Sequence, residues 1–286
     1  MKRWLFREPP AGSPPRGLAR ELSISPLLLD ILWRRGLDSP EELDAYLSAR
    51  LPDLVPPSRW PQFPQAAEVI SKALLDGKKL AVWGDYDVDG ITSSTLVLDV
   101  LEAHGLEALW HVPDRRSEGY GLNIPAIEEL AAQGCGILLT VDCGISDMAA
   151  VARARELGMT VVISDHHLPP PELPPADAIC NPRLGPEDDM PCPHLAGVGV
   201  AFFLMAAVNA ALAPHTGRRF KMDKVLDLVA LGTLADVMRL GGQNRILVRG
   251  GLDKLAEAER INHLLTEGSG TPVLPVTPSK PKNDKP

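Results

Sequence analysis

The chain has 286 residues, of which 45% are hydrophobic, and its formal net charge at pH 7 is −8. This hydrophobic content is enough for a substantial core in one large domain or two small ones. The negative charge excludes a protein that coats nucleic acid with a broadly basic surface, although it allows a basic groove beside an acidic metal site. The four cysteines form no C-x-x-C pair, and the first residues contain no apolar stretch typical of a signal peptide. We therefore expect a cytoplasmic protein with reduced cysteines.

Residues 1–64 predict a small helical region that ends in a linker. A Ser-Pro pair at Ser25 opens one short helix, and an Asp-Ser-Pro-Glu-Glu stretch at Asp38 opens a second. Prolines are dense from residue 52 to 64, which is typical of a linker. We therefore expect a domain boundary near Gln65.

From residue 65 to 260 the pattern alternates between short apolar runs and longer amphipathic ones. Buried strands are expected at 80–83, 108–112, 137–141 and 160–164, and helices at about 91–104, 124–133 and 147–157. This order predicts an α/β domain with a mostly parallel sheet and helices on both faces. Ligands of such sheets bind outside the carboxyl ends of the strands.

Residues 195–213 are almost entirely apolar, with Asn209 as the only polar side chain. A membrane span needs about 20 such residues, so the length alone allows one. The alanine-rich composition and the polar neighbourhood favour a buried core helix instead. Gly197 and Gly199 lack the third glycine of a dinucleotide-binding fingerprint. Two further helices are expected at 223–231 and 244–255, and residues 261–286 predict a disordered tail.

The segment GDYDVDG at 84–90 follows an apolar strand and carries three aspartates at alternate positions, Asp85, Asp87 and Asp89. The first half of a calcium-binding EF-hand loop has this spacing, but its twelfth residue would be glutamate and is Leu96 here. A strand also precedes the segment where an EF-hand has a helix. Alternate residues of an extended turn point the same way, so Asp87 and Asp89 can face one cation. Such a cation would offset the repulsion between the two carboxylates.

Aspartates also occur at the ends of three later predicted strands or helices. These ends carry Asp142, then Asp165 with His166 and His167, and finally Asp236. A lone aspartate at such an end is more often a helix cap or a turn former. The whole set, in this order, predicts a metal site instead. Mixed carboxylate and imidazole ligands suit Mn²⁺ or Mg²⁺.

The motifs GDYDVDG, VDCG, SDHH and GTLADV, in this order, resemble the four motifs of the DHH phosphoesterase superfamily. The stretches PDRRSEGYGLN, ICNPR and LAGVGVAF resemble its RecJ-like branch of single-strand-specific exonucleases. The resemblance covers about residues 20–255. It implies metal-dependent hydrolysis of phosphodiester bonds, with degradation of single-stranded DNA from the 5′ end in DNA repair or recombination as the expected reaction.

The resemblance also implies two metal ions, Mn²⁺ or Mg²⁺, bound by the side chains of Asp87, Asp89, Asp142, His166 and Asp236. Asp142 would bridge the ions, sharing one with Asp87 and the other with the remaining three ligands. Asp85 would lie behind the ligands, and His167 would contact the scissile phosphate or its leaving oxygen. Many members carry a further histidine ligand where this chain has Trp83. We therefore expect that the first ion binds more weakly, or that water and substrate supply the ligands that the histidine would provide.

Basic and aromatic residues in the RecJ-like stretches are candidates for holding a DNA strand by phosphate contacts and base stacking. They are Arg115, Arg116, Tyr120 and Arg183. Ordinary ion pairs in a surface loop explain the arginines equally well. A zinc site made of Cys180, Cys192 and His194 is disfavoured, because their spacing fits no common zinc pattern.

RecJ-like proteins continue into a second domain that closes the cleft, and commonly into an oligonucleotide-binding fold, and these 286 residues end before both. Three functions therefore stay open: a single-strand exonuclease, a phosphoesterase of short oligonucleotides or small phosphodiesters, and a non-catalytic partner-binding module. The full ligand set argues against the last. We expect single-stranded DNA as the main partner, a helicase or a single-strand-binding protein as a further one, and no membrane.

Overall fold

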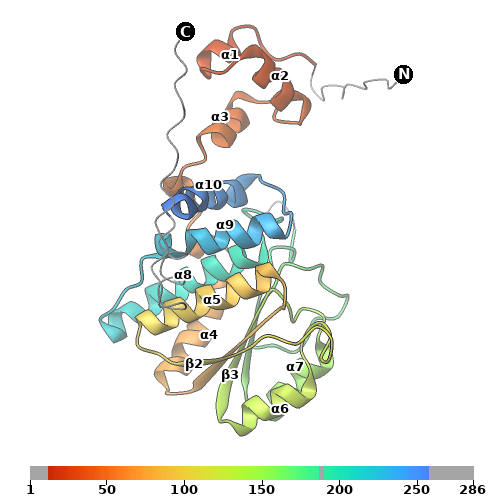
Figure 1. The fold of residues 1–286 in the computed structure, drawn as a ribbon, viewed down its shortest axis with the longest axis vertical. Helices are drawn as coiled ribbons and strands as arrows, with labels where there is room; N and C mark the ends of the chain where they lie inside the picture. The colour runs from red at the N-terminus through yellow and green to blue at the C-terminus, as the bar shows by residue number, and fades with distance from the viewer. Residues whose placement is uncertain (1–11, 187–189, 258–286) are drawn as a thin grey trace, which may run out of the picture.

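The computed structural model describes residues 12–186 and 190–257. Its centre is one sheet of five parallel strands in the order β2-β1-β3-β4-β5 (Figure 1). The strands are Lys79–Gly84 (β1), Ala108–His111 (β2), Cys135–Val141 (β3), Thr160–Ser164 (β4) and Ala178–Cys180 (β5). The first four lie where the sequence predicts strands. The fifth escapes prediction because three residues are too short to show an alternating pattern.

Helices cover both faces of the sheet, which confirms the predicted α/β architecture (Figure 1). One face carries α4 (Phe63–Leu75), α5 (Val88–Ala103) and α8 (Gly197–Thr216). The other face carries α6 (Ile124–Ala132) and α7 (Met148–Glu156). Two last helices pack outside α5 and α8, namely α9 (Leu226–Ala235) and α10 (Gly242–Glu257). A short 3-10 turn, Met222–Val225 (η4), precedes α9.

Alternation along the strands separates two hydrophobic cores. Leu80 and Val82 of β1 point into the larger core under α4, α5 and α8, whereas Ala81 and Trp83 point into the smaller core under α6 and α7. All four side chains are fully buried. The carboxyl ends of the strands are therefore held between two packed layers, which gives the side chains that follow them fixed positions.

Helix α8 is the buried core helix that residues 195–213 predict. By length and composition it could cross a membrane, with a mean hydropathy of 1.8 over its most apolar window. However, 67% of that window is buried inside the protein. Leu204 and Met205 are fully buried and Phe203 is nearly so, all within the larger core. The apolar composition of α8 thus follows from its central place in the fold.

The N-terminal region contains three short helices, α1 (Leu18–Glu21), α2 (Pro26–Arg34) and α3 (Pro40–Ser48). The hydroxyl of Ser25 accepts a hydrogen bond from the backbone N–H of Leu28 at 3.1 Å, and that of Ser39 accepts one from Glu42 at 3.2 Å. These caps explain why α2 and α3 begin at Ser-Pro pairs. The helices enclose a small core of their own, which contains Leu18, Leu29, Leu32, Trp33 and Leu43.

The proline-rich stretch at 52–64 is not the free linker that its composition predicts. One 3-10 turn, Leu51–Asp53 (η1), overlaps its start, and a second, Pro57–Arg59 (η2), lies within it. Trp60 is fully buried, with ring centroids 5.2 Å from Phe63 and 5.1 Å from Phe203. The stretch therefore belongs to the main core, and α4 begins two residues before the expected boundary at Gln65. The expected tail at 261–286 lies outside the described residues.

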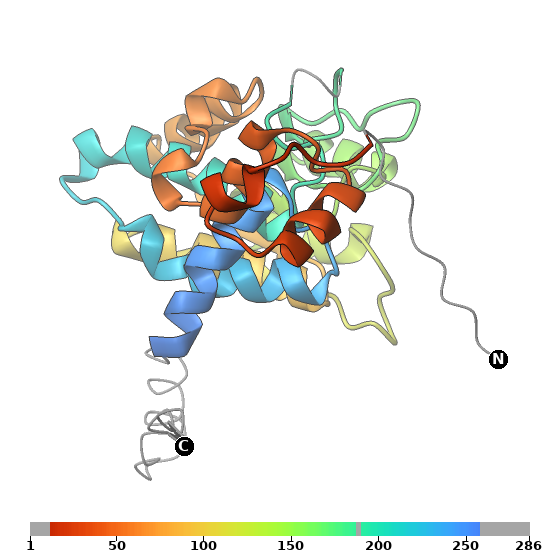
Figure 2. The ribbon, with the colours of Figure 1, turned by 90° about the horizontal axis from the view of Figure 1, so that it is seen from above.

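Helix α3 is attached to the rest of the protein through α10. Arg249 donates hydrogen bonds to the backbone carbonyls of Leu47 and Ser48, and Arg245 donates one to the carbonyl of Tyr46. The Arg245 guanidinium also lies 3.5 Å from the centre of the Tyr46 ring. Carbonyls in the last turn of a helix lack partners within the helix, and cations are favourable there. Figure 2 shows the N-terminal helices, in red, lying over α10, in blue.

Candidate metal centre

The acidic motifs meet at the carboxyl edge of the sheet. Asp85 follows β1, Asp142 follows β3, and Asp165 follows β4. Strand β1 lies between β2 and β3, so the order of the strands reverses beside it. Open parallel sheets bind their ligands at such a reversal, because the loops on its two sides diverge and leave a crevice. The site predicted from the sequence therefore has the expected position in the fold.

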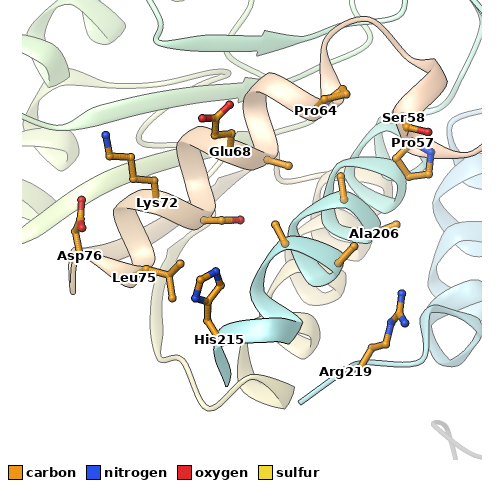
Figure 3. A pocket seen from close by; sticks show the side chains of 15 residues that line it. Pro57, Ser58, Pro64, Glu68, Lys72, Leu75, Asp76, Ala206, His215 and Arg219 are labelled. Atoms are coloured by element: carbon orange, nitrogen blue, oxygen red, sulfur yellow. The ribbon is translucent and has the colours of Figure 1, made fainter. Parts of the chain in front are cut away.

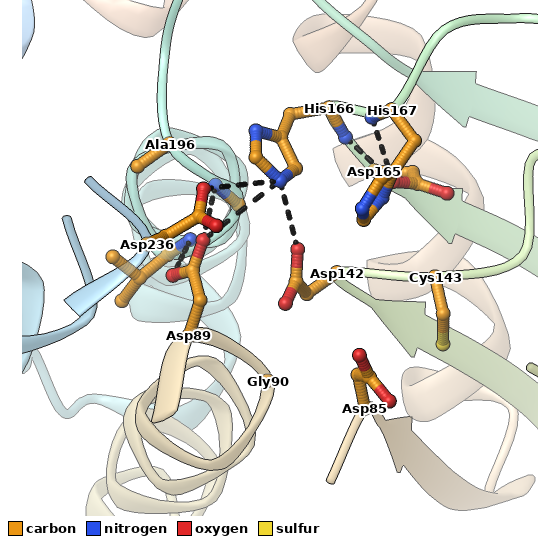
Figure 4. A network of polar contacts seen from close by, with 12 residues as sticks. Asp85, Asp89, Gly90, Asp142, Cys143, Asp165, His166, His167, Ala196 and Asp236 are labelled. Carbon is orange, nitrogen blue, oxygen red and sulfur yellow. Dashed lines mark hydrogen bonds and ion pairs between the residues drawn. The ribbon is translucent and has the colours of Figure 1, made fainter. Parts of the chain in front are cut away.

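Three groups of side chains have ligand atoms within 4.8 Å of one another. They are Asp85 with Asp87 and Asp142, Asp89 with His166 and Asp236, and Asp142 with His166 and His167. Because Asp142 and His166 each belong to two groups, the three form one continuous centre. In Figure 4, Nε2 of His166 faces Asp142, Asp236 and Asp89, with the shortest contact, 3.1 Å, to Oδ1 of Asp142.

Asp89 is held by the first turn of α8. Its carboxylate accepts hydrogen bonds from the backbone N–H groups of Gly197 at 2.9 Å and Val198 at 2.8 Å. A negative charge is favourable at this end of a helix. A Cβ atom on Gly197 would lie 2.4 Å from Oδ1 of Asp142 and 2.9 Å from Oδ2 of Asp89. Only glycine therefore leaves room where these two carboxylates meet, a role that its sequence neighbourhood does not indicate.

Asp142 has a left-handed backbone with a φ of 61°, which few residues other than glycine adopt. Its N–H donates to the carbonyl of Ser164 at 2.9 Å and so extends the pairing of β3 with β4. Apart from its contact with His166, the buried Oδ1 atom has no hydrogen-bond partner among the described residues. Burial and the nearby carboxylate of Asp89 raise the pKa of Asp142. A divalent cation would supply the partner that this oxygen lacks.

Burial also shifts the pKa values of the neighbouring ligands. It raises the pKa of Asp89 to about 6 and raises that of Asp85, and it lowers the pKa of His166. A neutral imidazole is the form that binds metals. The donors are carboxylate oxygens and imidazole nitrogens, without a thiolate, and this set fits Mn²⁺ or Mg²⁺. Asp85, expected behind the ligands, has a carboxylate oxygen within 4.8 Å of ligand atoms of Asp87 and Asp142.

Asp165 positions the two histidines, a role that the sequence analysis misses although SDHH contains it. Its Oδ1 accepts hydrogen bonds from the backbone N–H groups of His166 at 2.7 Å and His167 at 3.0 Å, and lies 2.8 Å from Nδ1 of His167. Its Oδ2 accepts the N–H of Ile145 at 2.9 Å. Burial opposes ionisation of Asp165, but these bonds hold its pKa below the usual value. The Asp165 hydrogen bond in turn raises the pKa of His167 to about 9.

Residues 79–233 match the family described as "DHH family, N-terminal domain". The match spans more than half of the chain and contains the first three acidic motifs and the start of the fourth. The chain belongs to the DHH family. All residues of the three ligand groups except Asp236 lie within the matched part of the chain.

The RecJ-like resemblance is confirmed by individual relatives. The single-stranded-DNA-specific exonuclease RecJ of Bacillus subtilis is 36% identical over 259 residues, covering 91% of this chain and 32% of the relative. RecJ of Haemophilus influenzae is 42% identical over 236 residues, covering 80% of this chain and 40% of the relative. The crystal structure of RecJ in complex with Mn²⁺ from Thermus thermophilus has a TM-score of 0.70 and 31% identity, over 90% of this chain and 36% of that one. This DHH-family chain therefore spans about a third to two fifths of their length.

A row of aromatic rings leads from His167 of this DHH-family chain to Arg115. The hydroxyl of Tyr120 lies 3.4 Å from Nδ1 of His167, and their rings are 5.9 Å apart. The ring of Tyr86 follows at 6.4 Å from that of Tyr120, and the Arg115 guanidinium lies 5.3 Å from the Tyr86 ring. The structure thus brings two of the four DNA-contact candidates, Tyr120 and Arg115, to the metal centre.

The other two candidates, Arg116 and Arg183, take part in none of these contacts within the described part of the chain. Arg116 is exposed, and its backbone N–H donates to Asp114. The backbone N–H of Arg183 donates to the side chain of Asn181, which itself donates to the carbonyl of His167 at 2.9 Å. Asn181 therefore links Arg183 to the histidine loop through the backbone, and contacts of both arginines with DNA stay a prediction.

Trp83, which stands where many superfamily members have a histidine, does not face the metal centre. Its ring is fully buried in the smaller core, and its centroid lies 4.1 Å from that of His111. The carboxylate of Asp85 is instead close to Asp87 and Asp142. Asp85 is therefore a candidate third ligand beside Asp87 and Asp142.

A groove of about 860 Å³ lies between α4 and α8 (Figure 3). Four alanines of α8 and the side chains of Ala67 and Leu75 form its apolar wall, and Glu68, Ser71, Lys72 and His215 are among its charged or polar lining residues. None of the residues that line it belongs to the metal-ligand groups. The groove is therefore separate from the centre described above.

Proposed function

We propose that this DHH-family chain hydrolyses phosphodiester bonds of single-stranded DNA with two divalent cations, Mn²⁺ or Mg²⁺. The observation that carries the proposal is the continuous set of ligand groups around Asp142 and His166, in which a buried carboxylate oxygen has no hydrogen-bond partner among the described residues. The names of the RecJ relatives, and the Mn²⁺ complex of the Thermus thermophilus protein, support both the substrate and the cations.

In this proposal two sets of side chains hold the ions. One set is Asp85, Asp87 and Asp142, and the other is Asp89, His166 and Asp236, with Asp142 bridging to the second ion. When bound, two such ions lower the pKa of a water molecule and stabilise the attacking and leaving oxygens of the phosphate. The chain itself must keep the ligands ionised and in place. The N–H groups of Gly197 and Val198 serve this purpose for Asp89.

His167 would act on the phosphate with its positive charge. Its hydrogen bond to Asp165 raises its pKa to about 9, which favours the protonated imidazole at neutral pH in the metal-free chain. The side chain is 45% exposed, unlike the buried His166, and can meet a substrate. A protonated imidazole beside the scissile bond would stabilise the developing negative charge or donate a proton to the leaving oxygen.

The row of Tyr120, Tyr86 and Arg115 would hold the strand next to His167. Aromatic faces stack on bases and a guanidinium contacts phosphate, without regard to sequence. Bases in a duplex are already stacked on one another, so this row favours a single strand. A 5′-to-3′ direction follows from the RecJ-like resemblance. We also propose a cytoplasmic setting, where a helicase or a single-strand-binding protein would present such strands.

The test is hydrolysis of a 5′-labelled single-stranded oligonucleotide with Mn²⁺, beside a matched duplex and a dinucleotide. Release of labelled mononucleotide from the long single strand, and much slower release from the duplex, is the expected result. An Asp142→Ala variant purified in the same way controls for contaminating nuclease. Turnover of the dinucleotide alone would favour the small-phosphodiester function, and no turnover of any substrate would contradict catalysis by these 286 residues.

A further inference from the structure

Asn244, the third residue of α10, is fully buried and makes three hydrogen bonds to backbone groups outside its own helix. Its Nδ2 group donates to the carbonyls of His194 at 2.6 Å and Arg239 at 3.2 Å. Its Oδ1 atom accepts the N–H of Ala196 at 3.1 Å. One amide therefore joins the segment before α8 to the segment after α9.

One joined segment leads into the turn that supports Asp89, and the other follows Asp236. Ala196 is the residue before α8, and the next two N–H groups along the chain hold the carboxylate of Asp89. Arg239 lies three residues after Asp236, which ends α9. Asp89 and Asp236 come together with His166 in one ligand group. The Asn244 amide thus connects the turn that holds Asp89 to the segment that follows Asp236.

We propose that Asn244 is a positioning residue for the metal centre. By fixing the start of α8 relative to the segment after Asp236, it holds Asp89 and Asp236 at the separation that one cation requires. This inference rests on the proposed function, in which Asp89, His166 and Asp236 bind one of the two ions. It assigns Asn244 no contact with the metal or the substrate.

The cost of losing this amide follows from burial. Without Asn244, the buried N–H of Ala196 would lose its partner and the part-buried carbonyl of His194 would lose a donor, whereas the carbonyl of Arg239 would keep the N–H of Gly241. Buried backbone groups rarely stay unpaired. The first turn of α8 would shift to recover a partner, and Asp89 would move with it. Loss of hydrogen-bonding partners behind metal ligands typically lowers metal affinity 10- to 100-fold. The group of Asp85, Asp87 and Asp142 is carried by the ends of β1 and β3, so its affinity should change little.

Asn209 offers a matched control on α8. It is also buried, and its amide also pairs with backbone, accepting from the N–H of Phe220 at 2.9 Å and donating to its carbonyl at 2.9 Å. It lies twelve residues after Gly197, which corresponds to about 18 Å along the helix. Asn209→Ala should therefore destabilise the fold as Asn244→Ala does, without moving the ligands.

The experiment is a calorimetric titration of Mn²⁺ into the full metal-free chain, with circular dichroism and urea unfolding to establish folding. For Asn244→Ala we expect the Kd of one of two Mn²⁺ sites to rise 10- to 100-fold while the other stays within threefold of wild type. For Asn209→Ala both should stay within threefold. Wild-type Mn²⁺ binding by Asn244→Ala, or equal weakening of both sites in the two variants, would overturn the inference.

Asn244→Asp keeps the test decisive if the alanine variant does not fold. It preserves the size of the side chain and the acceptor for Ala196, but it loses the donors to His194 and Arg239. We expect a smaller rise in the Kd of the same site, and unchanged affinity at that site would overturn the inference. Absence of Mn²⁺ binding by the wild type would instead overturn the proposed function, together with this inference.

Discussion

Burial of Asp89 predicts that the metal-free protein gains stability on mild acidification. Burial raises its pKa from 3.8 to about 6. Between these two values the native state binds a proton that the unfolded chain does not. The stabilisation is therefore fully present below pH 3.8 and is lost as the pH rises through 6. A shift of about two pKa units corresponds to about 3 kcal/mol in total, of which about 1 kcal/mol falls between pH 7 and pH 5.

Most other groups near the centre act in the same direction or outside this range, but His166 opposes the gain, because burial lowers its pKa and the unfolded chain then takes up a proton that the native state does not. The pKa of Asp142 and that of Asp85 are also raised by burial, so both add to the gain on acidification. The pKa of Asp165 is lowered instead, and its contribution is lost only as the pH falls below the usual carboxyl range. Since whole domains are stable by about 5–15 kcal/mol, a gain of about 1 kcal/mol is measurable.

The assay is urea unfolding at pH 5 and pH 7 in the presence of a chelator, followed by circular dichroism. Asp89→Asn should reduce the stability difference between the two pH values. The control variant Asp76→Asn, at an exposed position, should leave this difference unchanged. Saturating Mn²⁺ should reverse the trend, because the cation binds only the ionised ligands. An equal difference between pH 5 and pH 7 in wild type and Asp89→Asn would refute the reasoning.

The remaining predictions concern the centre and the strand. Asp142→Ala should abolish hydrolysis and weaken both Mn²⁺ sites in calorimetry, and substantial residual activity would contradict its bridging role. His167→Ala should lower kcat by about 10²-fold or more while Mn²⁺ affinity changes only a few-fold, as steady-state kinetics and titration would show. Asp165→Asn should move the pKa of His167 from about 9 toward 6.5 in an NMR titration of the metal-free protein, and an unchanged value would exclude the hydrogen bond as its cause. Tyr120→Ala should weaken single-strand binding in fluorescence anisotropy by about 1–3 kcal/mol, whereas Tyr120→Phe should retain it.

Local patterns were sufficient to predict most of the fold. Short runs of apolar residues identify four strands, and Ser-Pro pairs at Ser25 and Ser39 identify two helices, because both signals lie within a few neighbouring residues. Helix α4 and strand β5 are missed for opposite reasons. Proline density hides the start of α4, although Trp60 beside it is fully buried, and β5 is only three residues long.

In the candidate site too, some residues can be predicted from local sequence patterns and others cannot. The acidic ligands are predictable because each follows a strand or a helix, and Asp165 could have been assigned from its place beside His166. The supports of these ligands are not predictable from local pattern. Gly197 meets Asp89 across 108 positions of sequence, and Asn244 meets Ala196 across 48, so nothing nearby in the chain signals either contact.

At Asp142, the left-handed backbone lowers the stability of the fold, whereas the proposed catalysis requires the carboxylate at this position. For an L-amino acid this conformation costs about 1–2 kcal/mol, and burying the carboxylate near Asp89 adds to the cost. Glycine adopts the same φ freely and carries no charge. Selection for abundance alone would therefore favour glycine at position 142 and erase the centre, whereas selection for catalysis retains the less stable aspartate. This single residue is where the two evolutionary pressures on the chain diverge most directly.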